Sequence, residues 1–276
     1  MENIDKLTVD SFGDEWNKFD QNSLSDFELK NYFNNYFSIF PWDLIDSNSE
    51  GFDMGCGSGR WARLVAPKVK ILNCIDPSNA INVAKKNLKN HNNIIFIRAS
   101  ADNNNIKFSS QDFGYSIGVL HHIPDTQQAI DSCVKLLKPG APFLVYLYYS
   151  FDNRSFIYKF VWMASNILRF VLSKTNPNIK KIFCDIIAIF IYLPISRLSL
   201  VMEFFNFNIK NIPLSFYRRS SIYTMRTDSR DRFGTPLEKR FSKKQIFSML
   251  KNSGLENIVF SDKEPFWCAV GTKKRN

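Results

Sequence analysis

The sequence has few cysteines and histidines, and they are not grouped as metal ligands require. Its 276 residues include five cysteines and three histidines, and no two cysteines have the C-x-x-C spacing. Structural zinc sites need four such ligands at short spacings, and a disulfide framework needs many paired cysteines. We therefore expect no metal site, no disulfide framework and a reducing compartment.

Long uncharged apolar stretches are also missing. The longest, residues 186–196, contains Pro194 and is shorter than the roughly 20 residues of a membrane-spanning helix. The first ten residues lack a basic stretch followed by an apolar one, so no signal peptide is expected. We predict a cytoplasmic protein without a spanning helix, located in part on the inner face of the membrane.

Positive charge is concentrated in one part of the chain. The formal net charge is +10, and residues 151–241 alone hold 15 Lys and Arg against 6 Asp and Glu, hence +9. A basic protein can bind nucleic acid or an anionic membrane surface. These basic residues are interleaved with many aliphatic and aromatic ones, which disfavours nucleic acid as the partner.

Strand and helix patterns alternate from residue 51 onward, which is typical of a parallel sheet. The strands are expected near residues 50–54, 69–75, 94–98, 113–119 and 142–149, with later strands at 255–261 and 267–272. Helices are expected at 25–40, 78–90, 125–138 and 243–252. Ahead of them, Phe12, Trp16 and Phe19 form an aromatic segment that either packs on the core or covers a ligand.

A glycine-rich turn follows the first expected strand. Residues 51–61 read GFDMGCGSGRW, an apolar run that contains an acid and is followed by three glycines spaced G-x-G-x-G. Glycines at such a turn let backbone N–H groups approach a ligand without interference from a Cβ atom. Asp76 ends the next strand, where an acid can accept the hydroxyl groups of a ribose. The alternative role for Asp76 is a helix cap ahead of Pro77, and the two roles are compatible.

Two further motifs make the pattern specific. Residues 119–125 read VLHHIPD and residues 137–140 read LKPG. With the glycine turn and Asp76, they resemble the class I S-adenosylmethionine-dependent methyltransferases, in the group that includes ubiquinone, menaquinone and sugar methylases. The resemblance is close over residues 50–149 and looser over 242–276. It implies an α/β fold, a Rossmann-like doubly wound sheet that is mostly parallel with an antiparallel last strand, here with a helical insertion.

The resemblance also implies a cofactor, S-adenosyl-L-methionine, and the residues that bind it. Asp53, Gly55, Cys56, Gly57 and Gly59 are expected at the methionine and ribose, and Asp76 and Pro77 at the ribose. Ser100, Ala101 and Asp102 are expected beside the adenine, and the backbone of Gly118 and Val119 beside the sulfonium.

The catalytic residues are less specified by the sequence. Either His121 or His122, at the end of the fourth strand, can accept a proton from a hydroxyl acceptor, and we favour His121. The alternative is that both histidines only orient the next loop. Tyr148, Arg226, Asp228 and Arg232 are candidates for the substrate pocket, and the charged segment 226–241 is expected to be an ordered loop.

The segment between the fifth strand and the last helix is unusually long. We divide the chain into an N-terminal helical segment (1–50), a methyltransferase core (51–150 and 242–276) and a helical cap insertion (151–241), with insertion helices near 156–172, 179–193 and 198–207. Such a long connection is normally functional. It either roofs the acceptor pocket or touches anionic lipid through a rim of basic residues.

These patterns predict a methyltransferase that acts on a small-molecule, glycan or lipid-linked acceptor, through O-methylation. One alternative is C-methylation of a prenylated quinone or lipid at the membrane surface. The other, from a different class, is a membrane-associated cofactor-binding scaffold without activity. The residues alone do not name the acceptor atom.

Overall fold

The computed structural model describes residues 2–275, which divide into two compact units. Unit 1 comprises residues 1–21, 29–150 and 237–276, and unit 2 comprises residues 22–28 and 151–236. Each unit has its own hydrophobic core.

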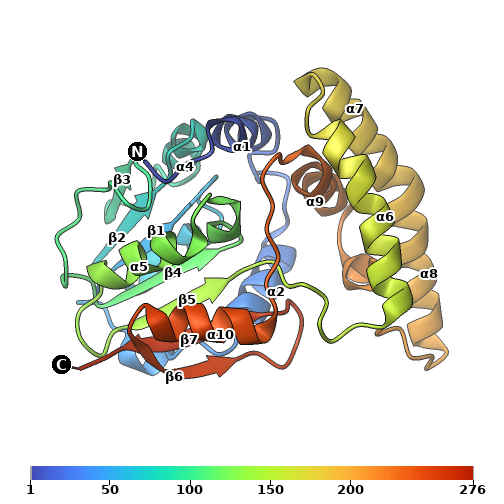
Figure 1. Ribbon diagram of the computed structural model, residues 1–276. Coiled ribbons are helices and arrows are strands. Elements are labelled where there is room, and N and C mark those ends of the chain that lie inside the picture. Colours follow the sequence, from blue (N-terminus) through green and yellow to red (C-terminus); the bar gives the residue numbers. More distant parts are fainter. Residues whose placement is uncertain (1, 276) are drawn as a thin grey trace. The chain divides into compact units, whose positions relative to one another are not determined.

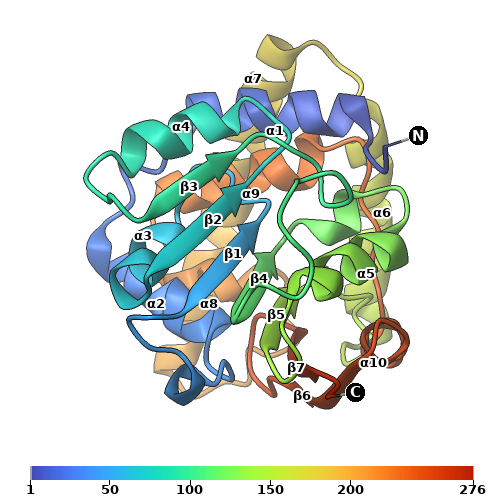
Figure 2. The ribbon, with the colours of Figure 1, turned by 90° about the vertical axis from the view of Figure 1, so that its left-hand side faces the viewer.

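Unit 1 is built on a seven-stranded sheet with the order β3-β2-β1-β4-β5-β7-β6, as Figure 2 shows. Strands β1 to β5 are parallel, and β7 runs antiparallel to both β5 and β6. The predicted α/β fold with an antiparallel end is therefore confirmed. The strands are β1 (Glu50–Met54), β2 (Ile71–Ile75), β3 (Ile94–Ile97), β4 (Phe113–Ile117), β5 (Pro142–Tyr146), β6 (Leu255–Phe260) and β7 (Cys268–Lys273).

Helices connect the strands of unit 1 and begin at the residues that their caps predict. Asp125 accepts a hydrogen bond from the Gln128 backbone N–H at the start of α5, and Ser242 forms a capping box with Gln245 at the start of α10. The aromatic segment at the N-terminus is helix α1, which the sequence analysis did not identify as helical. The helices are α1 (Lys6–Lys18), α2 (Asp26–Tyr36), α3 (Ala62–Val65), α4 (Ala80–Asn87), α5 (Thr126–Leu136) and α10 (Lys243–Asn252).

The centre of the sheet is held by two glycine–phenylalanine pairs. Gly51 of β1 lies opposite Phe113 of β4, and Phe52 of β1 lies opposite Gly114 of β4. Because side chains alternate between the two faces of a strand, one phenylalanine covers a glycine on each face. A Cβ atom at Gly114 would lie 2.2 Å from the Phe52 ring, and one at Gly51 would lie 2.3 Å from the Phe113 ring.

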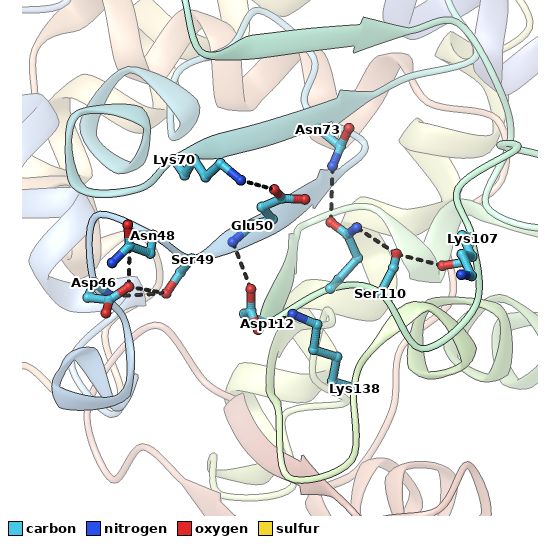
Figure 3. Close-up of polar contacts among 11 residues, drawn as sticks. Asp46, Asn48, Ser49, Glu50, Lys70, Asn73, Lys107, Ser110, Asp112 and Lys138 are labelled. Atoms are coloured by element: carbon cyan, nitrogen blue, oxygen red, sulfur yellow. Dashed lines mark hydrogen bonds and ion pairs between the residues drawn. The ribbon is translucent and has the colours of Figure 1, made fainter.

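A polar network joins the starts of β1 and β4 (Figure 3). Asp112 accepts from the Glu50 backbone N–H at 2.9 Å and pairs with Lys138 at 2.7 Å. Glu50 also pairs with Lys70 at 2.9 Å. These contacts are at the amino ends of the strands, and ligands in open parallel sheets bind at the carboxyl ends. The network is therefore structural.

Unit 2 consists of helices, and two sequence expectations about it are wrong. Segment 226–241 was expected to be a loop, but its first part belongs to helix α9 (Ile222–Gly234), which Ser221 caps. The expected helices 179–193 and 198–207 are one continuous helix formed by α7 (Pro177–Ile187), a π-helical turn (Ala188–Tyr192) and α8 (Leu193–Phe204). The predicted first insertion helix is observed as α6 (Phe156–Leu172), as Figure 1 shows.

Pro194 does not end the long helix because a wider turn precedes it. A proline inside an α-helix removes one hydrogen bond and clashes with the carbonyl group four residues earlier. Here the Leu193 N–H donates to Ala188, five residues back, so the backbone is already widened where the proline ring must fit. Residues 177–204 consequently form one helix that is long and apolar enough to cross a membrane by length and composition, with 33% of its most apolar window buried. The sequence predicts no spanning helix because no uncharged apolar run is long enough, whereas this helix meets the requirement by its length and composition.

The glycine–phenylalanine pairs generate a prediction about stability. Gly114→Ala should lower the free energy of unfolding by about 1–3 kcal/mol, because the added methyl group overpacks against Phe52. In a Phe52→Ala background the same substitution should cost less than about 0.5 kcal/mol, because the obstructing ring is gone. Urea unfolding of the four proteins of this cycle measures the coupling, and equal costs in both backgrounds would contradict the proposed contact.

Candidate functional site

The carboxyl ends of β1, β2 and β4 meet at the centre of the sheet. The strand order reverses between β1 and β4, and in open α/β sheets such a switch point is where ligands bind. The glycine turn, Asp76 and the residues that follow β4 all lie at this edge. The structure therefore brings together, on one edge, the groups that the sequence analysis assigned to the cofactor.

The glycine turn is held in place by Asp76. Asp76 Oδ2 accepts from the Gly57 backbone N–H at 2.9 Å, and its Oδ1 accepts from the backbone and hydroxyl of Ser78 at 2.9 and 2.6 Å. Asp76 is buried, and burial raises its pKa while these donors act in the opposite direction. Asn79 precedes α4 without a side-chain cap hydrogen bond, whereas the Ser78 hydroxyl accepts from the Ala80 backbone N–H at 3.1 Å. Asp76 therefore anchors the turn and, through Ser78, also orders the start of that helix.

The three glycines of the turn all have positive φ angles, of 78°, 52° and 80° for Gly55, Gly57 and Gly59. Packing inside the protein also excludes side chains at these positions. A Cβ atom at Gly55 would lie 2.4 Å from Val119, and one at Gly59 would lie 2.5 Å from Leu88. Backbone conformation and internal packing therefore require these glycines, whether or not a ligand approaches them.

Asp53 lies beneath the turn at the end of β1 and is almost fully buried. Burial raises the pKa of Asp53 to about 8, the nearby Tyr115 hydroxyl opposes this increase, and smaller effects come from the Asp76 carboxylate, which raises the pKa, and the Arg60 guanidinium, which lowers it. Its Oδ2 atom has no hydrogen-bond partner among the residues that the structure describes. An unpaired buried carboxylate oxygen is costly, so this atom is a candidate to receive a positively charged donor.

A second acid, Asp102 after β3, has one carboxylate oxygen without a hydrogen-bond partner in the described chain. Asp102 Oδ2 accepts from the Asn3 backbone N–H at 3.0 Å, whereas its buried Oδ1 has no hydrogen-bond partner in the described part of the chain. The neighbouring Ser100 hydroxyl is likewise buried without a partner there. Ser100 and Asp102 are therefore both candidate acceptors for an amino group, and Asp102 is the charged one of the two.

Helix α1 covers the turn and the start of α4. A Cβ atom at Gly57 would lie 3.0 Å from Trp16 Nε1, and one at Gly13 would lie 3.4 Å from the Asn79 backbone nitrogen. The Arg60 guanidinium lies 4.2 Å from the Trp61 ring centre and 5.9 Å from that of Trp16. Phe12 contacts the His122 ring, with centroids 4.9 Å apart. The aromatic segment therefore packs on the turn, on the start of α4 and on His122, and its role as a cover for a ligand stays a prediction.

Space remains beside Gly118, at the end of β4. Its φ angle is +77°, and a Cβ atom there would have a single neighbour within 4 Å, the Tyr146 ring at 3.9 Å. Tyr146 contacts Tyr36 and Tyr148, with ring centroids 5.0 and 5.8 Å apart. The sequence analysis assigned Tyr148 to the substrate pocket but missed Tyr36 and Tyr146. Side chains two residues apart in extended backbone lie on the same side. This spacing from Tyr148 is the sequence feature that could have identified Tyr146.

The two histidines after β4 have different hydrogen-bond patterns. His122 Nδ1 lies 2.6 Å from the Leu237 carbonyl oxygen, which can only accept, so this nitrogen carries a proton and Nε2 has the lone pair of a base. His121 Nδ1 instead accepts from the Tyr148 backbone N–H at 3.4 Å, which places the proton on Nε2. Burial lowers the pKa of His121 well below its usual value. The tautomer therefore favours His122 as a proton acceptor.

The remaining predicted residues are distributed between the two units. Residues 237–241 belong to unit 1, where the Lys239 N–H donates to the His121 carbonyl at 3.1 Å and the Phe241 N–H to that of Tyr148 at 2.9 Å. Arg226, Asp228 and Arg232 are in α9 of unit 2. Their assignment to the substrate pocket stays a prediction.

Thiol and metal chemistry find no support at this edge. The neighbouring Cys74 thiol and burial raise the pKa of the Cys56 thiol well above its usual value, so Cys56 stays protonated. Among residues 2–275, no group of three or more His, Cys, Asp or Glu side chains is arranged to hold a metal ion.

Comparison with known proteins agrees with this geometry. Residues 52–145 match the family model described as a methyltransferase domain. The chain is 32% identical over 106 residues to a ubiquinone biosynthesis O-methyltransferase of Saccharophagus degradans. This match covers 37% of the chain and 43% of the relative, so the chain spans less than half the length of that protein.

Solved structures share the fold. An O-methyltransferase family protein from Burkholderia thailandensis has a TM-score of 0.53 at 12% identity, over 90% of this chain and 57% of that one. A protein named as a methyltransferase, solved with the Haloferax volcanii Trm112 methyltransferase activator, has a TM-score of 0.53 at 12% identity, over 95% and 98%. The family match therefore identifies a methyltransferase domain at residues 52–145, and these likenesses show that the chain shares the fold of the two solved structures.

Proposed function

We propose that this chain transfers a methyl group from S-adenosyl-L-methionine to a hydroxyl group of a small-molecule, glycan or lipid-linked acceptor. The observation that carries the proposal is the glycine turn anchored by Asp76, together with Asp53 Oδ2 in β1 and Asp102 Oδ1 after β3, two buried carboxylate oxygens that make no hydrogen bond in the described chain. The family's cofactor has an ammonium group at one end and an adenine amino group at the other. The two unpaired acceptors fit these two donors.

Different acids around the turn are assigned to different parts of the cofactor. Asp53 binds the ammonium group, because a positive charge offsets the cost of ionising a buried carboxyl. Asp76 accepts from the ribose hydroxyls with its remaining lone pairs, since each carboxylate oxygen accepts more than one hydrogen bond. Asp102 accepts from the adenine amino group. The open side of Gly118 then lies where the reacting end must be.

The chemistry needs alignment more than it needs side chains. S-adenosyl-L-methionine supplies an electrophilic methyl group on a positively charged sulfur. Tyr36, Tyr146 and Tyr148 provide aromatic surface beside Gly118, and α1 with Trp16 excludes water from the turn. Orientation and a water-poor site together lower the barrier for in-line transfer.

His122 supports a hydroxyl group as the acceptor. A hydroxyl must lose a proton during transfer, and the Nε2 lone pair of His122 provides a proton acceptor next to the Tyr148 ring, whose centroid is 5.6 Å from that of His122. The name of the Saccharophagus relative also supports O-methylation. C-methylation of a prenylated quinone is the alternative, and the histidine variants below distinguish the two.

The first prediction concerns cofactor binding. Asp102→Ala should weaken S-adenosylmethionine binding by at least about tenfold, because it leaves a polar group of the ligand unpaired, and Asp76→Ala should weaken it at least as much, because it also releases the turn from the Gly57 N–H contact. Asp112→Ala, an acid of the structural network at the amino ends of the strands, is the matched control and should bind like the wild type. Isothermal titration calorimetry measures the three affinities. Unchanged binding in both site variants would reject the assignment.

The second prediction concerns Asp53 and pH. With a folded pKa of about 8 and an unfolded value near 4, Asp53 keeps its proton in the folded protein after the unfolded chain has lost it. Stability should therefore fall as pH rises from about 4 to 8. Asp53→Asn cannot ionise, so its stability relative to the wild type should improve by at least about 1 kcal/mol between pH 5 and pH 8.

Urea unfolding of both proteins without cofactor at the two pH values measures this difference. The same variant should bind S-adenosylmethionine at least about tenfold more weakly, because an amide does not compensate an ammonium charge. A stability difference that does not change with pH would show that Asp53 titrates normally.

The third prediction separates the two histidines. His122→Ala should lower turnover about 100-fold or more, the usual size of a general-base effect, with cofactor affinity changed less than about threefold. His121→Ala should affect turnover less, because its tautomer offers no lone pair at Nε2. Release of S-adenosylhomocysteine is followed with the best acceptor from a panel of phenols, sugars and prenylated phenols. Wild-type turnover in His122→Ala would assign His122 a structural role and favour a carbon acceptor.

A further inference from the structure

The helices of unit 2 have the reverse of the polarity expected in water. Every exposed residue of α6 is apolar: Phe156, Ile157, Phe160, Val161, Met163, Ala164, Ile167, Leu168, Phe170 and Val171. The polar residues of the same helix, including Ser165, Asn166 and Arg169, are the less exposed ones. A helix on the surface of a soluble protein normally has its charged face outside.

The long helix of residues 177–204 repeats this reversal. Its exposed residues are Pro177, Asn178, Ile179, Ile182, Phe183, Ile186, Ile189, Phe190, Ile191, Pro194, Leu198, Val201 and Phe204. Asn178, in the first turn, is the one polar residue in this set. The fully buried positions of the helix include Ser196 and Ser199. We call the exposed apolar residues of α6 and of this long helix the outward face.

Three charged residues of these helices, Arg169, Lys180 and Asp185, are directed toward α9 and the segment that follows it. Arg169 donates to the Thr235 and Pro236 carbonyls at 3.0 and 3.1 Å, and buried Lys180 donates to the Gly234 carbonyl at 2.9 Å. Asp185 forms a two-point ion pair with Arg226 of α9, with both contacts at 2.8 Å.

These inward contacts correct the sequence-based expectation of a basic outer rim. Arg154 is buried and donates to the Lys210 carbonyl, and Arg197 donates to the Arg218 and Ser220 carbonyls at 2.6 and 2.9 Å. The exposed basic residues of unit 2 are at the ends of the helices: Lys174, Lys210 and Arg219. The apolar area between the ends therefore has polar groups only at its limits.

We propose that the outward face is inserted into a lipid bilayer. Most exposed large apolar side chains in the described chain lie between residues 156 and 207, and soluble proteins rarely leave so many of them exposed in one region. Lipid is the occupant that this chemistry fits. A protein partner would require interspersed hydrogen-bonding groups, and the outward face offers none along its length, whereas the lysines and arginine at its ends match lipid headgroups.

The same packing indicates insertion into one leaflet. Helices α6 and α7 pack against α9, which contains Arg226, Asp228, Arg230, Asp231 and Arg232. Moving such a charged helix into the hydrocarbon region is costly. A helix layer with one apolar and one polar side instead lies in the membrane interface. This inference goes beyond the proposed activity and does not depend on it.

The test is flotation of the full-length protein with vesicles of neutral phosphatidylcholine. The protein should float with the vesicles in 0.1 M and in 1 M salt, because insertion of an uncharged face is not screened. Adding anionic lipid should change the floated fraction less than about threefold. Binding that requires anionic lipid and disappears in 1 M salt would overturn insertion in favour of surface adsorption.

Matched variants locate the contact. A triple variant with Phe160→Glu, Ile167→Glu and Phe190→Glu should reduce flotation at least about tenfold. Phe108→Glu in unit 1 is the control, because Phe108 is 67% exposed and Phe190 is 73% exposed. Calorimetric binding of S-adenosylmethionine, measured on the same samples, should be unchanged in all of them, so failure of this proposal is distinguishable from failure of the proposed activity.

Two other possible covers of the outward face predict different results in the flotation experiment. If a second copy covers the outward face, the wild type stays out of the vesicle fraction and is a dimer by light scattering that the triple variant disrupts. If the rest of the chain covers it, the wild type is a monomer that does not float. Either result overturns the proposal.

A fluorescent label gives an independent measurement. All five native cysteines are buried, so a Phe190→Cys variant can be labelled selectively with an environment-sensitive dye. Its emission should shift to shorter wavelength when vesicles are added, whereas the same dye at Phe108→Cys should not respond. Equal responses at both positions would contradict insertion through the outward face.

Discussion

The hydrogen bond between Asp76 and the Gly57 N–H is the contact on which the site depends. It ties the turn after β1 to the end of β2 at 2.9 Å, and the same carboxylate fixes Ser78 ahead of α4. With the turn held there, Asp53 is covered and its carboxyl stays buried, which raises its pKa. The Asp76 carboxylate therefore holds the turn, the buried Asp53 and the start of α4 in place together.

Two buried carboxylate oxygens near the turn lower the stability of the folded protein, and a bound ligand can remove this loss. Asp53 Oδ2 and Asp102 Oδ1 are buried without hydrogen-bond partners in the described chain, and such atoms destabilise a protein unless something binds them. Unit 1 buries polar atoms that lack partners, whereas unit 2 exposes apolar side chains to solvent. Polar groups lacking partners indicate a polar ligand, and exposed apolar helices indicate an apolar environment.

Much of unit 1 could be read from the sequence because its signals are local. Strand β1 and helix α10 match their predicted bounds, since a glycine turn and a capping box mark their ends. Helix α1 was missed because Gly13 and several polar residues weaken its helical pattern. The tautomers of His121 and His122 depend on Tyr148 and Leu237, which are distant in sequence, so no local pattern could have distinguished the two.

Unit 2 was harder to predict because its pattern is inverted. A sequence rich in Phe and Ile with scattered Lys and Arg suggests apolar residues inside and basic residues outside, and the structure has the opposite arrangement. Pro194 likewise suggested a helix end, because the π-helical turn before it has no clear sequence signal. Charge placement, not charge content, determines what kind of surface this unit presents.

The glycines and the acids of the turn do not carry equal information about function. Gly55 and Gly59 are required by their positive φ angles and by Val119 and Leu88, so a larger residue there would disturb the fold with or without a ligand. Loss of binding in a glycine variant could not separate these causes. Asp53 Oδ2 and Asp102 Oδ1 make no hydrogen bond within the described chain, although the other oxygen of Asp102 accepts from the Asn3 backbone N–H. A conservative change at these acids therefore reports on the ligand itself.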